Sequence, residues 1–212
     1  NARNVFDGLW VESHNSALMV DGSRRTEIFH KSKLVVGVEK TPYPEVLCPL
    51  DDKLGGVMGR CSGQDEVSLL HVKCDSLEIP VGCAVCYESV YGEYFTEYIR
   101  KGAQAMTIIT NDAWWGNTPG YRQHLSYASL RAIETRRAIA RCANTGISAF
   151  ISPSGEILQP TPWWEPAAIM SNIPLRNDIT FFVSHGDITG RICTFLFLLL
   201  LLAILVRFRT QY

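Results

Sequence analysis

The stretch IPVGCAVCYESVYGEYF, residues 79–95, joins an apolar run to a segment of acidic and aromatic side chains. The pattern predicts a buried strand over residues 80–85 and a helix over residues 88–101 that ends at Gly102. Cys86 falls at the junction between this strand and this helix. At such a junction the side chain leaves the plane of the sheet, and the N–H groups at the start of the helix point towards that side chain. Such a position lowers a thiol pKa and supplies donors for an oxyanion, so Cys86 is a candidate nucleophile.

Other roles for the two cysteines of this stretch are weaker. Cys83 lies inside the apolar run and is expected to be packed. A redox pair needs both sulfurs at a helix start, whereas Ala84 and Val85 extend the strand. A zinc site lacks a second Cys-x-x-Cys, and the five histidines are scattered, so neither a metal nor another cofactor is expected. A buried structural role for Cys86 stays open, because free cysteines are commonly buried.

Strand-like and helix-like segments alternate outward from this stretch, which indicates an α/β layered domain. A second helix is expected over residues 126–143, and residues 40–66, rich in Gly, Pro and Asp, are expected to form a long loop. The other expected strands are residues 16–21 and 26–29 (a hairpin turned by Gly22), 67–72, 105–110 and 147–152.

Length and net charge limit the number of domains and the classes of partner. The 212 residues can form one large domain, here residues 1–190, and the net charge of −1 gives no indication of nucleic acid binding. The chain begins without Met or a signal peptide and is expected to be a fragment.

Residues 191–212 are expected to form a transmembrane helix and a short tail. From residue 192 to 206 every residue except Thr194 is apolar, and the absence of a polar face disfavours a core helix. This run would span about 22 Å of a roughly 30 Å hydrocarbon core, and flanking side chains can snorkel to add length. Arg207 and Arg209 favour a cytoplasmic C-terminus, although Arg191 on the other side opposes this.

Several motifs together carry a family resemblance. VCYESVYGEYF (85–95) resembles the cysteine elbow of the nitrilase superfamily, whose members carry a carbon-nitrogen hydrolase domain, and FHKSKLVVGVE (29–39) resembles its lysine motif. Residues 111–158 and the tail TFFVSHGDITGR (180–191) are similar to one branch, the apolipoprotein N-acyltransferases. The likeness extends from about Asn15 to the last helix.

The resemblance implies a nitrilase-like αββα sandwich, incomplete at its N-terminus, on the periplasmic side of a bacterial inner membrane. It also implies a Glu-Lys-Cys triad in which Cys86 attacks a phospholipid acyl ester and becomes a thioester. The acyl acceptor would be the α-amine of the diacylglyceryl-modified cysteine of an apolipoprotein.

The resemblance further assigns roles to residues around the nucleophile. Lys31, with the backbone N–H of Tyr87, would stabilise the oxyanion, and Glu39 would orient Lys31 or assist proton transfer. Glu88 falls beside the nucleophile as well. Trp114 and Trp115 would line the entrance for the acyl chain.

Ordinary structural roles compete with these assignments. Lys31 could be a solvated lysine beside Lys33, Glu39 a loop carboxylate, Glu88 a first-turn acid, and the tryptophan pair interface packing. His124 suggests a Cys–His dyad but is expected to be structural, because the lysine motif already supplies the cation.

Two departures from the family pattern are visible. The lysine motif here reads VVGVE, without the proline that many relatives carry before Gly-Glu. The triad Glu belongs tens of residues before the lysine, and neither Glu12 nor Glu27 matches it. The chain alone is therefore expected to be inactive; a soluble nitrilase-type amidase and a non-catalytic remnant are the alternatives.

Overall fold

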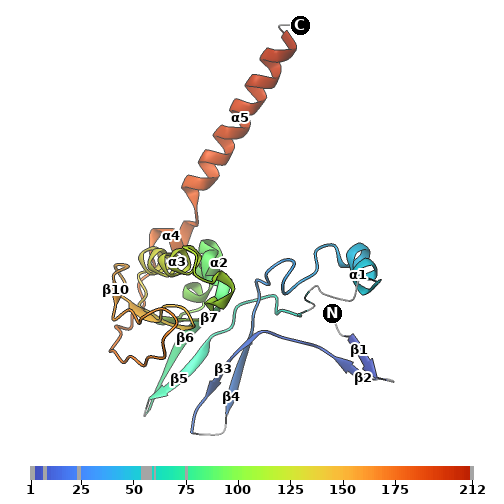
Figure 1. The fold of residues 1–212 in the computed structure, drawn as a ribbon. Helices are drawn as coiled ribbons and strands as arrows, with labels where there is room; N and C mark the ends of the chain where they lie inside the picture. Colours follow the sequence, from blue (N-terminus) through green and yellow to red (C-terminus); the bar gives the residue numbers. More distant parts are fainter. Residues whose placement is uncertain are drawn as a thin grey trace.

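The computed structural model describes residues 3–6, 9–22, 25–53, 59, 61–74 and 76–210. Its central feature is a six-stranded sheet in the order β10-β9-β8-β7-β6-β5 (Figure 1). The three central strands are parallel to one another, and the outer strands are antiparallel to their neighbours. The strands are β5 (Leu70–Cys74), β6 (Leu77–Val85), β7 (Ala105–Asn111), β8 (Ile139–Asn144), β9 (Ala149–Ile151) and β10 (Ile157–Leu158).

The parallel register decides where a site can form. β6 pairs with β7 from Val81↔Ala105 to Val85↔Ile109, so both strands end at the same edge of the sheet. Cys86 directly follows β6, and Asp112 directly follows β7. In open α/β sheets ligands bind outside the carboxyl ends of parallel strands, so a site is expected at this edge.

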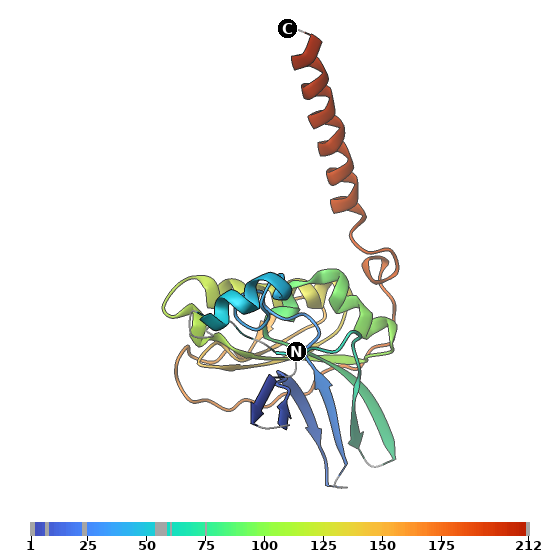
Figure 2. The ribbon, with the colours of Figure 1, turned by 90° about the vertical axis from the view of Figure 1, so that its right-hand side faces the viewer.

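Helices α2 (Gly92–Arg100) and α3 (Gly120–Thr135) cover one face of the sheet (Figure 2). Phe95 and Tyr98 of α2 are fully buried in the hydrophobic core with Met106 of β7. The Tyr98 hydroxyl donates a hydrogen bond of 2.9 Å to the carbonyl of Cys83, so its polar end is satisfied inside the core.

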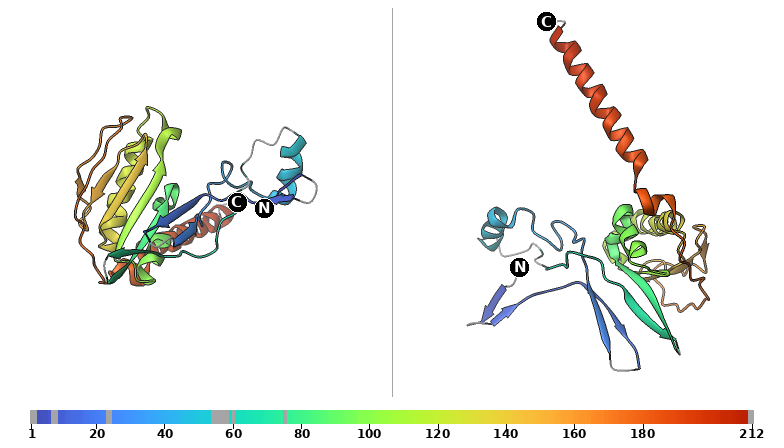
Figure 3. Two further views of the ribbon diagram at one scale, coloured as in Figure 1. Left: turned by 90° about the horizontal axis from the view of Figure 1, so that it is seen from below. Right: turned by 180° about the vertical axis from the view of Figure 1, so that it is seen from behind.

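The expected hairpin is confirmed as β3 (Ser16–Val20) and β4 (Thr26–His30), paired from Ser16↔His30 to Val20↔Thr26. It lies beside β5 and β6, with Phe29 edge-on to Tyr98 at 5.9 Å between ring centroids. β1 (Arg3–Phe6), β2 (Leu9–Val11) and α1 (Pro44–Lys53) stand away from the main sheet (Figure 3).

The prediction of a helix over residues 126–143 is wrong for the second half of this segment. α3 ends at Thr135, Arg136 adopts a left-handed conformation with φ of 53°, and the chain then enters β8. Parallel pairing with β7, beginning at Met106↔Ile139, places Ile139 in the core. This tertiary pairing overrides the helical periodicity of the segment.

Other boundaries also shift. The segment 40–66 is not one long loop, because α1 begins at Pro44, where a proline suits the first turn, and carries Glu45 early and Lys53 late. The helix expected over residues 88–101 is divided into the 3₁₀ helix η1 (Cys86–Val90) and α2. β5 begins at Leu70, three residues after the start that was expected.

The chain continues through α4 (Phe181–His185) into α5 (Ile188–Thr210), which projects from the sheet domain (Figure 1). The segment Ile188–Phe208 has a mean hydropathy of 2.4, and none of it is buried against the rest of the chain. Its 21 residues span about 31 Å, close to the thickness of a hydrocarbon core. By length and composition α5 could cross a membrane, and it is longer than the apolar run of residues 192–206 suggested.

Candidate active site

Cys86 occupies a strained backbone position at the end of β6. Its φ is 55°, a left-handed conformation that residues other than glycine rarely adopt. Such conformations cost about 1–3 kcal/mol and persist where the surrounding structure imposes them, often at active sites. Cys86 also opens η1, so the following N–H groups, beginning with that of Tyr87, come directly after the sulfur-bearing residue.

Lys31 directly follows β4 and is completely buried. Its Nζ donates to both carboxylate oxygens of Glu39, at 2.9 Å to Oε1 and 2.8 Å to Oε2. Val35 N–H and Asn15 Nδ2 donate to the same carboxylate at 2.7 and 2.8 Å. Burial acts to raise the pKa of Glu39, but the hydrogen bonds from Lys31, Val35 and Asn15 outweigh it and lower the pKa. Lys31 is therefore a buried, paired cation and not a solvated lysine.

Glu88 joins the lysine loop to the cysteine elbow. Its Oε1 accepts hydrogen bonds from the main-chain N–H of Ser32 (2.7 Å) and Lys33 (2.9 Å) and from the Tyr94 hydroxyl (2.9 Å). Its Oε2 accepts from the N–H of Val85 at 2.8 Å. Burial raises the pKa of Glu88 in spite of these donors. Glu88 thus fixes the residue after Lys31 relative to the residue before Cys86.

Glu88→Ala is expected to lower the free energy of unfolding by more than about 3 kcal/mol. Two buried donors, Val85 N–H and the Tyr94 hydroxyl, and two partly buried ones, Ser32 and Lys33 N–H, would lose their acceptor. Each buried donor left unsatisfied costs about 1–3 kcal/mol. Urea unfolding of the detergent-solubilised chain measures the loss, and Glu156→Ala, at an exposed position, is the matched control. Equal midpoints for the two variants would show that Glu88 does not hold the loops together.

His124 has both ring nitrogens engaged. Nδ1 lies 2.9 Å from Asp112 Oδ1, and Nε2 lies 3.2 Å from the carbonyl oxygen of Cys86 and 3.2 Å from Ser89 Oγ. The ring therefore contacts the backbone of Cys86. Arg141 Nη2 binds the other oxygen of Asp112 at 2.6 Å. Burial acts to raise the pKa of Asp112, but His124 and Arg141 outweigh it and lower the pKa.

The cysteine elbow borders a cavity of about 780 Å³. Glu39 and Cys86 lie on its wall, and Trp114 and Trp115 belong to η2 (Asp112–Trp115), directly after β7. Trp114 is 77% exposed, and Trp115 is 36% exposed, so the pair is not packed as an ordinary internal contact. The cavity is lined by Asn15, Val35, Val38, Glu39, Cys86, Tyr87, Ile109, Thr110, Asn111, Trp114, Trp115 and His124.

Cys83 differs from Cys86 in its burial and in its access to the cavity. It is buried within β6, and burial raises the pKa of its thiol to about 11. Both residues are free thiols, and Cys86, half-buried, lies on the cavity wall. A thiol with such a raised pKa is a poor nucleophile at neutral pH.

The structure brings most of the expected site residues together. Cys86, Tyr87, Glu39, Trp114 and Trp115 line one cavity, and Lys31 and Glu88 are tied to it through Glu39 and the elbow. Glu12 and Glu27 are engaged elsewhere, with His14 (3.7 Å) and His71 (3.2 Å) respectively.

Sequence reasoning missed the support that Asp112 and Arg141 give to the elbow. The one available signal for Asp112 was its place after the buried strand of residues 105–110. Arg141 gave no signal, because residues 126–143 were expected to form a helix.

Comparison with known proteins shows the family of the chain. Residues 7–177 match the family model described as Carbon-nitrogen hydrolase. Among curated proteins, the Apolipoprotein N-acyltransferase of Chlorobaculum tepidum is 33% identical over 181 residues, which cover 84% of this chain and 34% of that protein. The protein of the same name from Geobacter metallireducens is 31% identical over 191 residues, 88% of this chain and 35% of that protein. The chain thus spans about a third of the length of these relatives.

Solved structures share the fold at low sequence identity. An amidase from Nesterenkonia sp. superposes with a TM-score of 0.52 at 16% identity, over 80% of this chain and 57% of the amidase. Saccharomyces cerevisiae Nit3, a member of branch 10 of the nitrilase superfamily, superposes with a TM-score of 0.51 at 17% identity. The match covers 72% of this chain and 51% of Nit3. The nitrilase fold is therefore confirmed, and the chain belongs to the carbon-nitrogen hydrolase family.

Proposed function

We propose that this chain supplies the nucleophile-bearing part of an enzyme that transfers an acyl chain from a phospholipid to the N-terminus of a lipoprotein. The observation that carries the proposal is the strained Cys86 elbow on the wall of a cavity that also holds Glu39 of the Lys31–Glu39 pair and the exposed Trp114. The relatives named Apolipoprotein N-acyltransferase support the choice of substrates. α5 supports a reaction at a membrane.

The proposed reaction has two steps. In the first, the Cys86 thiolate attacks the carbonyl carbon of the acyl ester, the bond to the glycerol oxygen breaks, and the lysophospholipid leaves with a proton. In the second, the α-amine of the diacylglyceryl-cysteine attacks the thioester, the C–S bond breaks, an amide forms, and the amine proton is passed on as the thiol is restored. Lys31 and the Tyr87 N–H would stabilise the oxyanion in both steps.

The proton transfers need a base, and each carboxylate that the structure describes near Cys86 is already engaged with other groups. Glu39 is the one carboxylate among the described residues that line the cavity, and it is bound to Lys31. Glu88 accepts four hydrogen bonds, and Asp112 is held by His124 and Arg141. The family resemblance gives the role to a Glu tens of residues before Lys31.

Residues 1–212 expressed alone are therefore expected to give no measurable acyl transfer. General acid–base help is worth about 10²–10⁴ in rate, and positioning of the two lipids contributes more. A chimera in which this chain replaces the matched segment of the Chlorobaculum tepidum relative should be active. The assay follows a labelled phospholipid acyl chain to a diacylglyceryl peptide. An inactive chimera that is folded and membrane-bound would contradict the proposed function, and an active isolated chain would show that Glu39 or another acid acts as the base.

We also propose that α5 anchors the chain in the bacterial inner membrane, with the sheet domain on the periplasmic side. Carbonate extraction is expected to leave residues 1–212 in the membrane fraction and to release a chain that ends at residue 187. A reporter fused after residue 212 is expected to be active in its cytoplasmic form. Release of the full chain by carbonate would contradict the anchor, and a periplasmic reporter signal would contradict the orientation.

A further inference from the structure

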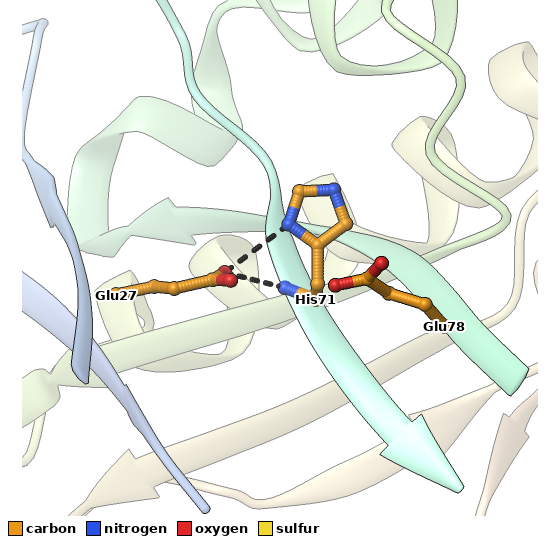
Figure 4. Close-up of side chains that lie close together, drawn as sticks. All are labelled: Glu27, His71 and Glu78. Atoms are coloured by element: carbon orange, nitrogen blue, oxygen red, sulfur yellow. Dashed lines mark hydrogen bonds and ion pairs between the residues drawn. The ribbon is translucent and has the colours of Figure 1, made fainter. Parts of the chain in front are cut away.

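A group of metal-ligating side chains lies outside the active-site cavity. Glu27 of β4, His71 of β5 and Glu78 of β6 each offer one ligand atom, and these atoms all lie within 4.8 Å of one another. Glu27 and Glu78 approach His71 from opposite sides (Figure 4). Glu78 stands near the start of β6, whereas Cys86 follows its end, so this group is separate from the active site.

Strand register and a contact between Glu27 and His71 bring the three residues together. In the β5–β6 register Lys73 faces Glu78 and His71 faces Pro80, so Glu78 is the diagonal neighbour of His71 on the same face. The main-chain N–H of His71 donates to Glu27 Oε2 at 2.7 Å, and Nδ1 lies 3.2 Å from the same oxygen. This bifurcated contact holds the Glu27 carboxylate against the imidazole.

We propose that Glu27, His71 and Glu78 form a binding site for a divalent transition-metal ion such as Zn²⁺. One neutral imidazole and two carboxylates form a donor set that Zn²⁺ and related ions accept, with water completing the coordination. A bound cation would also relieve the repulsion between the two carboxylates that flank His71.

Binding of an ion would require the three ligand atoms to come closer together than they are now, within 4.8 Å of one another. Ligands around a tetrahedral Zn²⁺ with bonds of about 2.1 Å lie roughly 3.4 Å apart. Glu27 Oε2 and His71 Nδ1 already lie 3.2 Å apart, so Glu78, which is exposed, is the ligand that would have to move closer.

The site has a structural consequence for the lysine motif. Glu27 lies on β4, four residues before Lys31, and β4 packs beside β5. An ion bound by all three residues would cross-link β4 to β5 and β6 at the end of the hairpin remote from Lys31. The occupied site would therefore stabilise the strand that presents the buried lysine.

The test is Zn²⁺ binding to detergent-solubilised residues 1–212 after the thiols have been alkylated, measured by competition with a chromophoric chelator. The wild-type chain is expected to take up one equivalent. Glu78→Gln is expected to weaken binding more than about 100-fold, because loss of a ligand costs more than the 10–100-fold typical of outer-shell changes. His14→Ala, which changes another half-exposed histidine beside a glutamate, should keep wild-type affinity.

Glu78→Gln is the decisive variant, because its exposed side chain can change without disturbing the core. His71→Ala should lose the ion as well. Occupancy should raise the melting temperature of the wild-type chain and of His14→Ala, but not that of Glu78→Gln. No Zn²⁺ uptake by the wild type, or equal uptake by wild type and Glu78→Gln, would overturn the proposal.

Discussion

Cys86→Ser should reduce acyl transfer by the chimera by at least about 10⁴-fold, as expected for the loss of a covalent nucleophile. Serine keeps the shape of the elbow, including the left-handed backbone at φ 55°, but its hydroxyl is a far weaker nucleophile than a thiolate. A loss of activity in this variant would therefore be due to the loss of the thiolate and not to a change in the fold of the turn.

Cys83→Ala is the matched control for this experiment. Cys83 is buried, its pKa is raised to about 11, and it lies three residues before the elbow. Activity should stay close to that of the parent, with a modest loss of stability from the small cavity. Equal loss of activity from both substitutions, together with a Cys83–Cys86 disulfide, would indicate a redox pair in place of a nucleophile.

Lys31→Met should reduce the rate of transfer by about 10²–10³-fold, the usual effect of removing one oxyanion-stabilising donor. Methionine fills a similar volume without a charge, and Glu39 would lose its two hydrogen bonds from Nζ. Lys31→Arg should not restore the rate, because a guanidinium needs more room and a different geometry in a site that is fully buried.

Lys33→Met is the control for Lys31→Met. Lys33 is exposed, and its Nζ lies 5.2 Å from the centre of the Tyr94 ring, so its loss should leave the rate near that of the parent. A single-turnover measurement of thioester formation locates the effect in the chemical step. Equal rates for the Lys31 and Lys33 variants would contradict the oxyanion role.

Local patterns were sufficient to predict the part of the fold that carries the nucleophile. The apolar run before Cys86 becomes the end of β6, and residues 105–110 fall within β7. Both segments have an unambiguous apolar signal, because central parallel strands are buried on both faces. The lysine motif was identified by resemblance, since spacing alone favours a solvated Lys31.

The boundary between α3 and β8 could not be predicted in the same way. The segment after Thr135 contains good helix formers, and its pairing with β7 on one side and β9 on the other makes it a strand. This error also moved Arg141 to the wrong place. A buried arginine becomes understandable only when Asp112, from a distant strand end, is seen 2.6 Å from its guanidinium.

The hydrogen bonds of Glu88 could not be predicted from the sequence either. Its sequence context fits an ordinary acid in the first turn of a helix, and nothing local indicates four hydrogen-bond donors. Two of those donors belong to Ser32 and Lys33, more than fifty residues earlier in the chain. Such a contact depends on how the lysine loop meets the cysteine elbow, which is decided by the tertiary fold.

The central claim is that Cys86 carries the acyl chain as a thioester, and mass spectrometry of the chimera tests it most directly. After incubation with phospholipid and without an acceptor, the peptide that contains residues 83–86 should gain the mass of one acyl chain. Fragmentation should place the chain on Cys86, and hydroxylamine should remove it. An acyl chain on Cys83, a disulfide between the two cysteines, or an unmodified peptide from an enzyme that still transfers would contradict the account.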